Sequence, residues 1–174
     1  MKKLLFAFLL CIGLMATAHA AEPKPISGLY IGNIFSALEQ AATGTNFIFD
    51  GDAAEKSCKV ACTATAEVAK DSQVMVTYEK DGGKVTAVTF IIQMAYPEKP
   101  QVTEAMLRGV YAVQTLGRLI SREISDADLK KMQQSVGITA KGLIQGTPGN
   151  MTYDGIELNG IFLSGVYMVA ASGK

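Results

Sequence analysis

Residues 73–94 read QVMVTYEKDGGKVTAVTFIIQM, and this stretch decides the fold class. Valine, threonine, isoleucine and phenylalanine dominate two runs, Gln73–Tyr78 and Lys84–Met94, which flank the tripeptide Asp-Gly-Gly at 81–83. Residues of these types favour extended strands, and glycine-rich dipeptides between two such runs are typical of a tight hairpin turn. The sequence therefore predicts an antiparallel β-hairpin.

Apolar residues alternate along both predicted strands. Successive side chains of a strand point to opposite faces of the sheet, so residues two positions apart share a face. On this basis one face of the hairpin carries Val74, Val76, Tyr78, Val88, Phe90 and Ile92. The hairpin therefore needs another element to cover that face.

Two helices are predicted directly after the hairpin. Residues 102–122 repeat an apolar side chain every three or four positions, which is typical of a helix with one buried face. Gly109 and Gly117 within it leave room for close packing on another element. Ser125 followed by Asp128 is a capping-box variant and predicts a second helix through about Ser135.

The segment before the hairpin predicts a further helix and a short strand. Residues 33–43 place apolar side chains at helical spacing, with Asn33 as the cap and Gly44 as the end. Residues 46–49 are apolar and predict a strand, whereas residues 50–71 are the least regular part of the chain.

A second hairpin is predicted at the C-terminal end. Residues 151–158 and 161–170 flank Asn159-Gly160, a pair typical of a type I′ turn, and Asp154-Gly155 is a competing turn site. The last strand is apolar on both faces and is expected in the middle of a sheet. Because the strands arrive as hairpins, the sequence predicts an α+β fold, in which an antiparallel sheet carries a short N-terminal helix and a central helix pair.

The first twenty residues have the pattern of a secretory signal peptide. Lys2 and Lys3 precede an apolar run over 4–15, and Ala18-His19-Ala20 is a small-x-small cleavage pattern. We expect cleavage near Ala20, a single domain over Ala21–Lys174 and a periplasmic or secreted location. The apolar run is too short to span a membrane, and nothing later in the chain reaches the required ~18 apolar residues.

Composition excludes several classes of function. The chain has 16 basic and 16 acidic side chains, and removal of the leader leaves 14 basic and 16 acidic, which argues against nucleic-acid binding. His19 is the chain's single histidine and leaves with the leader. A Ser-His-Asp triad, a histidine general base and a histidine-ligated zinc site are therefore impossible in Ala21–Lys174.

Cys58 and Cys62 are the cysteines that follow the leader. An oxidising compartment favours a disulfide between them, and the spacing of four residues fits a loop or distorted turn better than a regular helix. Redox or metal use and a pair of free thiols are the alternatives. The spacing is C-x-x-x-C instead of the redox motif C-x-x-C, so we expect a structural disulfide or a stapled loop that binds a partner.

Three cations are candidate partner-binding residues. Lys59 lies near the tip of the cysteine loop, and Arg118 and Arg122 are four residues apart on the long predicted helix. Guanidinium groups bind carboxylates or phosphates. An ordinary charged helix face is the alternative interpretation.

A small apolar ligand is a second possible partner. Phe90, Met94, Met106 and Tyr111 could line a pocket between the sheet and the long helix, although methionines are equally common as core filler. The acidic residues Asp50, Asp52 and Glu55 lack the spacing of a calcium-binding EF-hand loop, and we expect no metal and no cofactor.

The sequence-based hypothesis is an exported, non-enzymatic protein that binds another envelope or secreted protein, as an inhibitor, an immunity factor or an envelope accessory. A carrier of small apolar ligands is the alternative. A carboxylate-dependent envelope hydrolase is a third, since Asp or Glu pairs such as Asp154 and Glu157 perform acid–base chemistry without histidine.

Overall fold

The computed structural model describes residues 24–58, 61–94, 99–139, 144, 149–163 and 165–174. Within these residues the chain forms three helices and seven strands, as the α+β prediction required. In chain order they are α2 (Ile34–Ala41), β1 (Glu55–Cys58), β2 (Cys62–Ala69), β3 (Ser72–Tyr78), β4 (Val85–Gln93), α3 (Lys99–Ile120), α4 (Asp126–Ser135), β5 (Gly149–Tyr153), β6 (Ile156–Leu163) and β7 (Val166–Gly173).

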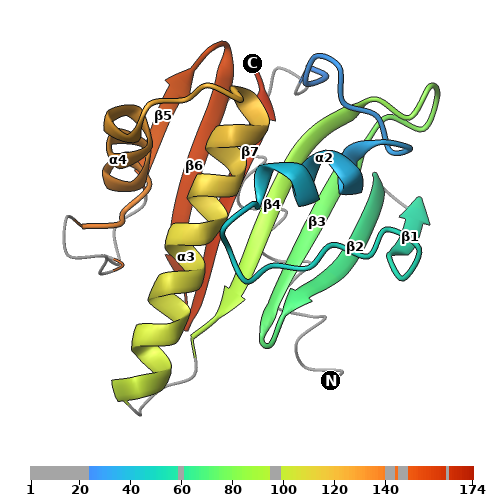
Figure 1. The fold of residues 1–174 in the computed structure, drawn as a ribbon. Helices are drawn as coiled ribbons and strands as arrows, with labels where there is room; N and C mark the ends of the chain where they lie inside the picture. Colours follow the sequence, from blue (N-terminus) through green and yellow to red (C-terminus); the bar gives the residue numbers. More distant parts are fainter. Residues whose placement is uncertain (1–23, 59–60, 95–98, 140–143, 145–148, 164) are drawn as a thin grey trace.

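The seven strands form one antiparallel sheet in the order β1-β2-β3-β4-β7-β6-β5 (Figure 1). Strands β1 to β4 form one meander and β5 to β7 form another, so each meander ends on a central strand of the sheet. β4 and β7 join the two meanders through seven antiparallel residue pairs, from Ala87 opposite Ser172 to Gln93 opposite Val166.

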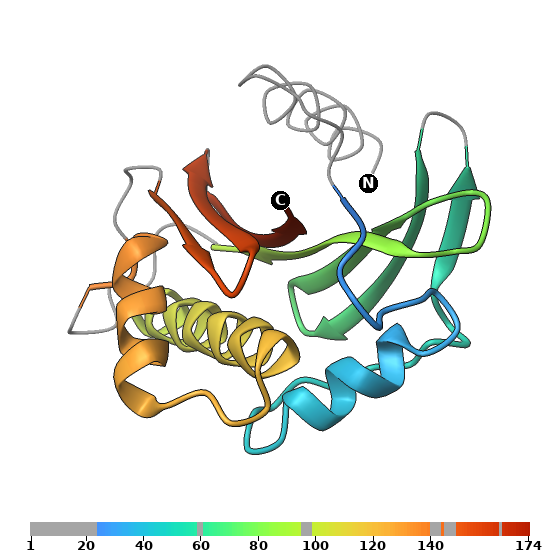
Figure 2. The same cartoon turned by 90° about the horizontal axis from the view of Figure 1, so that it is seen from above.

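The three described helices cover the same face of the sheet (Figure 2). α3 packs against β4 and β7, α2 packs against α3, and α4 packs against both α3 and β5. The buried core lies between the helices and this face, which we call the helix face. Its most deeply buried large side chains include Tyr167, Phe90, Ile34, Leu38, Ile92, Leu116 and Met132.

The structure confirms the predicted central hairpin and the buried face of its two strands. Val74 lies opposite Phe90 and Val76 lies opposite Val88, and all four side chains are fully buried. α2 and α3 also form where the apolar periodicity predicted helices, and α4 forms where the serine cap predicted one. Close packing at Gly117 of α3 is confirmed as well, because a methyl group there would collide with Leu129 of α4.

Two predictions for residues 46–71 are wrong. Residues 46–49 form no strand; Phe47 and Phe49 pack into the core from an irregular segment, and the Ile48 N–H donates a backbone hydrogen bond to the Val68 carbonyl oxygen. Residues 50–71 were expected to be irregular but contain β1 and β2. In β2, small residues such as Ala64 and Ala66 alternate with polar residues. The buried positions of this strand are therefore only weakly hydrophobic, and the sequence shows no clear strand pattern although these side chains are buried.

The predicted turn at Asn159-Gly160 is also wrong. Both residues lie within β6, and the hairpin turn is at the competing site, where Asp154 and Gly155 have φ values of 49° and 74°. Positive φ at both central residues is the requirement of a type I′ turn. β6 and β7 are instead joined by a tight connection that contains Gly165, with φ of 79°.

Gly160 serves close packing between the sheet and the end of α4. A methyl group at this position would collide with the carbonyl oxygen of Val136 and lie 2.7 Å from the Val136 Cβ. A methyl group at Gly149, on the neighbouring strand, would likewise collide with the carbonyl oxygen of Ser135. The buried Tyr167 hydroxyl donates a hydrogen bond to the Val136 carbonyl oxygen at 3.0 Å, and burial raises the pKa of this phenol far above its usual value. Backbone contacts therefore hold the end of α4 directly on the strands.

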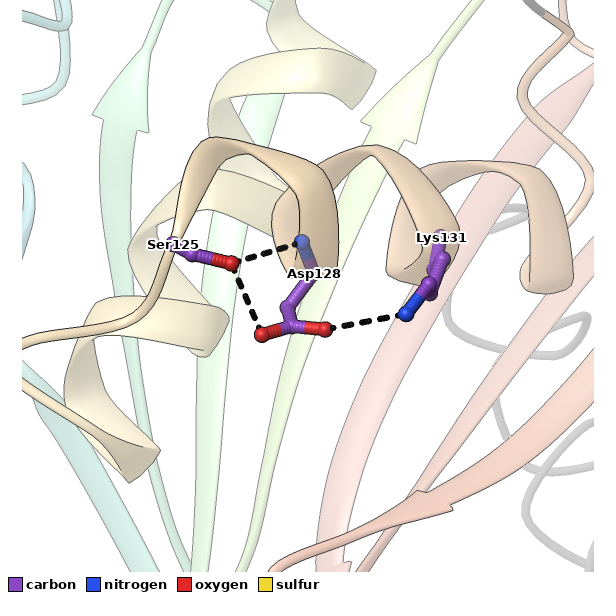
Figure 3. A network of polar contacts seen from close by, with 3 residues as sticks. All are labelled: Ser125, Asp128 and Lys131. Atoms are coloured by element: carbon purple, nitrogen blue, oxygen red, sulfur yellow. Dashed lines mark hydrogen bonds and ion pairs between the residues drawn. The ribbon is translucent and has the colours of Figure 1, made fainter.

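α4 begins with the predicted serine cap (Figure 3). The Ser125 hydroxyl accepts a hydrogen bond from the Asp128 backbone N–H at 3.1 Å and donates one to the Asp128 carboxylate at 2.8 Å, and Lys131 lies 3.4 Å from the other carboxylate oxygen. The serine hydroxyl first, and Lys131 second, hold the pKa of Asp128 below its ordinary value.

No helix within the described part of the chain combines the length and the apolar character that a membrane span requires.

Replacing Gly160 by alanine should destabilise the fold by about 1–3 kcal/mol, because the added methyl group overpacks the contact with Val136. The control is Gly32→Ala, since nothing lies within 4 Å of the position of its added methyl group. This control should change the free energy of unfolding by about 0.5 kcal/mol or less. Urea titration measures both variants, and equal stabilities would contradict the packing role of Gly160.

Ser125→Ala should cost about 1 kcal/mol by removing the N-cap and should raise the pKa of Asp128 toward its ordinary value. The pKa of Asp128 is lower in the folded state than in the unfolded state. The Asp128 carboxylate therefore stabilises the fold at pH values above its unfolded-state pKa, and this stabilisation is lost as the pH falls through its folded-state pKa. The stability difference between wild type and Ser125→Ala should therefore narrow in acid. Carboxyl NMR titration tests the pKa, with Ser121→Ala as the control.

Candidate functional site

The Cys58–Cys62 disulfide is present and closes the tip of a hairpin. The two cysteines end β1 and begin β2, and they are directly opposite each other in the pairing, with 4.0 Å between their Cα atoms. This confirms the expected disulfide between these residues. Cys58 is exposed, whereas Cys62 is buried. Lys59, the candidate contact at the tip, lies outside the described residues.

The structure does not bring the two candidate arginines together on one helix. Arg118 lies in the last turn of α3 and donates a hydrogen bond to the Thr43 carbonyl oxygen at 2.6 Å. This bond joins α3 to the turn that follows α2. Arg122 lies beyond the end of α3 and is exposed. Arg122 is thus the more accessible of the two for a partner.

The four residues of the predicted ligand pocket lie in or against the core. The Phe90 ring stacks on the Phe47 ring at 5.3 Å between centroids, and Tyr111 meets Phe47 edge-on at 6.2 Å. Phe90 is fully buried, Met94 is buried, and Met106 packs against the core. A ligand in this position would have to displace Phe47, a residue that the sequence-based prediction had placed in a strand.

A cleft of about 360 Å³ lies between α3 and α4. Its lining is mainly polar and differs from the apolar pocket expected from the sequence. The lining residues are Gln114, Asp126, Leu129, Lys130, Gln133, Gln134 and Thr139.

One carboxylate of the acidic loop before β1, that of Asp50, supports a local turn. Asp50 accepts hydrogen bonds from the backbone N–H groups of Asp52 and Ala53 at 3.0 and 3.1 Å. Among the residues that the structure describes, no three Asp, Glu, Cys or His side chains converge on a possible metal site.

The opposite face of the sheet, which no described helix covers, carries an apolar patch. We call this face the open face. Register aligns Ile91, Met168 and Ile161 in one row across β4, β7 and β6. Neighbouring rows add further apolar side chains, so that the apolar patch consists of Met75, Ile91, Ile161, Leu163, Val166, Met168 and Ala170.

The apolar patch is separate from the hydrophobic core. Phe90, Ile92, Tyr167 and Val169 from the same strands belong to the core, but no residue of the patch does. The centre of the patch is shielded, with Ile91 and Met168 exposed by 7% and 8%, while Leu163 at its margin is 45% exposed. Met75, Ile161 and Val166 are half-buried. The accessible apolar surface of the patch is therefore at Leu163 and, in part, at Met75, Ile161 and Val166. Exposed apolar side chains that lie next to one another are a feature of interaction sites.

Neutral polar and acidic side chains surround the apolar patch. Its neighbours across the open face include Gln73, Thr89, Asn159 and Gln93. The charged side chains among the described strand positions of this face are the carboxylates Glu55, Glu67 and Glu157. Lys174, directly after β7, adds one amino group, which lies 3.5 Å from the hydroxyl of Thr152 opposite Glu157. The open face therefore has an apolar centre and an acidic margin.

Comparisons with protein-family models, with curated proteins and with solved structures found no match. The geometry of the chain itself is therefore the basis of the functional argument.

Removing the disulfide by Cys58→Ser with Cys62→Ser should loosen β1 and leave the rest of the sheet intact. A ring this small constrains the unfolded chain by only about 2 kcal/mol, and the four residues of β1 are all exposed. Hydrogen exchange with mass spectrometry should show faster exchange at residues 55–58 and unchanged protection in β3 and β4. Equal loss of protection in β3 and β4 would show that the disulfide holds the whole sheet.

Proposed function

We propose that Ala21–Lys174 is an exported, non-enzymatic protein that binds another envelope or secreted protein through the open face of its sheet. The single observation that carries this proposal is the apolar patch, which lies on the opposite side of the sheet from the core. The pattern of the leader supports export. Inhibition, immunity and envelope assembly are all roles that a protein-binding face of this type can serve.

The patch favours protein binding over the alternatives. Phe90 and Tyr111 fill the proposed carrier pocket together with Phe47, so no space for an apolar ligand is evident there. Asp154, a candidate acid for hydrolysis, is part of a hairpin turn, and Glu157 lies at the margin of the open face. Neither carboxylate lines the described cleft between α3 and α4.

The mechanism of binding would be burial of apolar surface against a complementary partner. Burying the exposed part of Leu163 and the half-buried Ile161 contributes to affinity in proportion to the area removed from water, at about 25 cal/mol per Å² before the costs of association. The disulfide hairpin is the competing binding element, because its exposed Cys58 lies at the edge of the same sheet.

Ile161→Gln with Leu163→Gln should weaken partner binding at least tenfold, because two apolar contacts in the patch are lost. The partner is first captured from an envelope extract with tagged Ala21–Lys174 under oxidising conditions, and its affinity is then measured by calorimetry. Thr152→Gln is the matched control, since Thr152 is exposed on the open face but lies outside the patch. Its affinity should equal that of wild type.

Two results would contradict the proposal. Unchanged affinity of the Ile161→Gln, Leu163→Gln variant, together with lost affinity of the Cys58→Ser, Cys62→Ser variant, would assign binding to the disulfide hairpin. Absence of any stoichiometric protein in the capture would exclude protein binding as the function. Circular dichroism and thermal melting of each variant verify that its fold is intact.

A further inference from the structure

The charges of the open face distinguish between possible partners of the apolar patch. Glu67 on β2 and Glu157 on β6 lie on opposite sides of the patch, and Glu55 lies on the edge strand β1. One described cation lies at this margin: the amino group of Lys174, directly after β7, is 3.5 Å from the hydroxyl of Thr152, the residue opposite Glu157, so three carboxylates face one amino group. Acidic proteins, nucleic acids and anionic lipid surfaces would meet like charge at the margin, whereas a basic partner would meet opposite charge.

The same charges disfavour a second copy of this chain as the occupant. A symmetric dimer formed by two open faces would bring the acidic margins of both copies into one interface, because a two-fold interface uses the same patch on each subunit. Glu55 and Glu67 are exposed and Glu157 is half-buried, and each open face sets one described cation, Lys174 beside Thr152, against these three carboxylates, so repulsion would outweigh attraction.

The dimensions of the patch fit a helix. Neighbouring strands lie about 4.8 Å apart, so the patch, which extends from β3 to β6 across four strands, is roughly 14 Å wide. A helix with side chains is about 10–12 Å across.

We infer that the occupant of the apolar patch is a basic amphipathic helix of a partner protein, with its apolar face on the accessible side chains Met75, Ile161 and Leu163 and its cations directed toward Glu67 and Glu157. This inference rests on the proposed function and adds the chemistry of the partner to it. Electrostatic attraction at the margin sets specificity and association rate, while the patch supplies the buried area.

The test uses two synthetic 18-residue amphipathic helical peptides that share a leucine face, one with lysine and one with glutamate on the polar face. Fluorescence anisotropy measures their binding to Ala21–Lys174 at low and high salt. The lysine peptide should bind at least tenfold more tightly than the glutamate peptide, and added salt should weaken it.

Charge and patch variants locate the binding site of the lysine peptide. Glu67→Gln with Glu157→Gln should weaken binding three- to tenfold and reduce its salt dependence, and the Ile161→Gln, Leu163→Gln variant should weaken it further. Glu123→Gln is the matched control, because Glu123 is an exposed carboxylate in the turn after α3. It should leave the affinity unchanged.

The outcomes separate this inference from the proposed function. Equal binding of the two peptides, or equal effects of the Glu123→Gln and Glu67→Gln, Glu157→Gln variants, would overturn the basic-helix inference. If the captured partner still required Ile161 and Leu163 in that case, the proposed function would stand. A captured partner that is indifferent to both residues would overturn the proposed function itself.

Discussion

The antiparallel pairing of β4 with β7 is the contact on which the rest of the architecture depends. It joins two meanders that are far apart in sequence into one sheet, and it fixes which side chains of both strands face the helices. Phe90 lies opposite Val169 and both are buried beneath α3, while Ile91 lies opposite Met168 on the open face. A shift of one residue in this register would exchange the two sets, so the core and the apolar patch have the same structural origin.

Much of the fold followed from local pattern, and the errors have physical causes. The 73–94 hairpin and the helices α3 and α4 were predictable because valine-rich alternation, 3.6-residue periodicity and a serine cap each have a strong local signature. The prediction of a turn at Asn159-Gly160 was wrong because a glycine that permits a turn and a glycine that permits close packing look alike in sequence. Gly160 permits close approach to Val136, whereas the turn falls at Asp154-Gly155.

The candidate site was less predictable than the fold, since it depends on contacts between distant segments. The disulfide followed from spacing and expected compartment, but the hairpin that it closes did not. The row of Ile91, Met168 and Ile161 requires the strand order β4-β7-β6, which no local pattern specifies. The sequence of β7 gave a partial indication of the apolar patch. This strand is apolar on both faces, so both faces are expected to pack against other elements, and the described helices pack against one of them.

Methionine methyl NMR of the partner complex tests the central claim, binding at the open face, most directly. The six methionines of Ala21–Lys174 divide between the faces: Met75 and Met168 belong to the apolar patch, and Met94, Met106, Met132 and Met151 lie in or against the core. Addition of the captured partner to protein labelled at the methionine methyl groups should shift the Met75 and Met168 signals and leave the other four unchanged. Shifts confined to the core methionines, or no shift at Met75 and Met168 at saturation, would contradict the account.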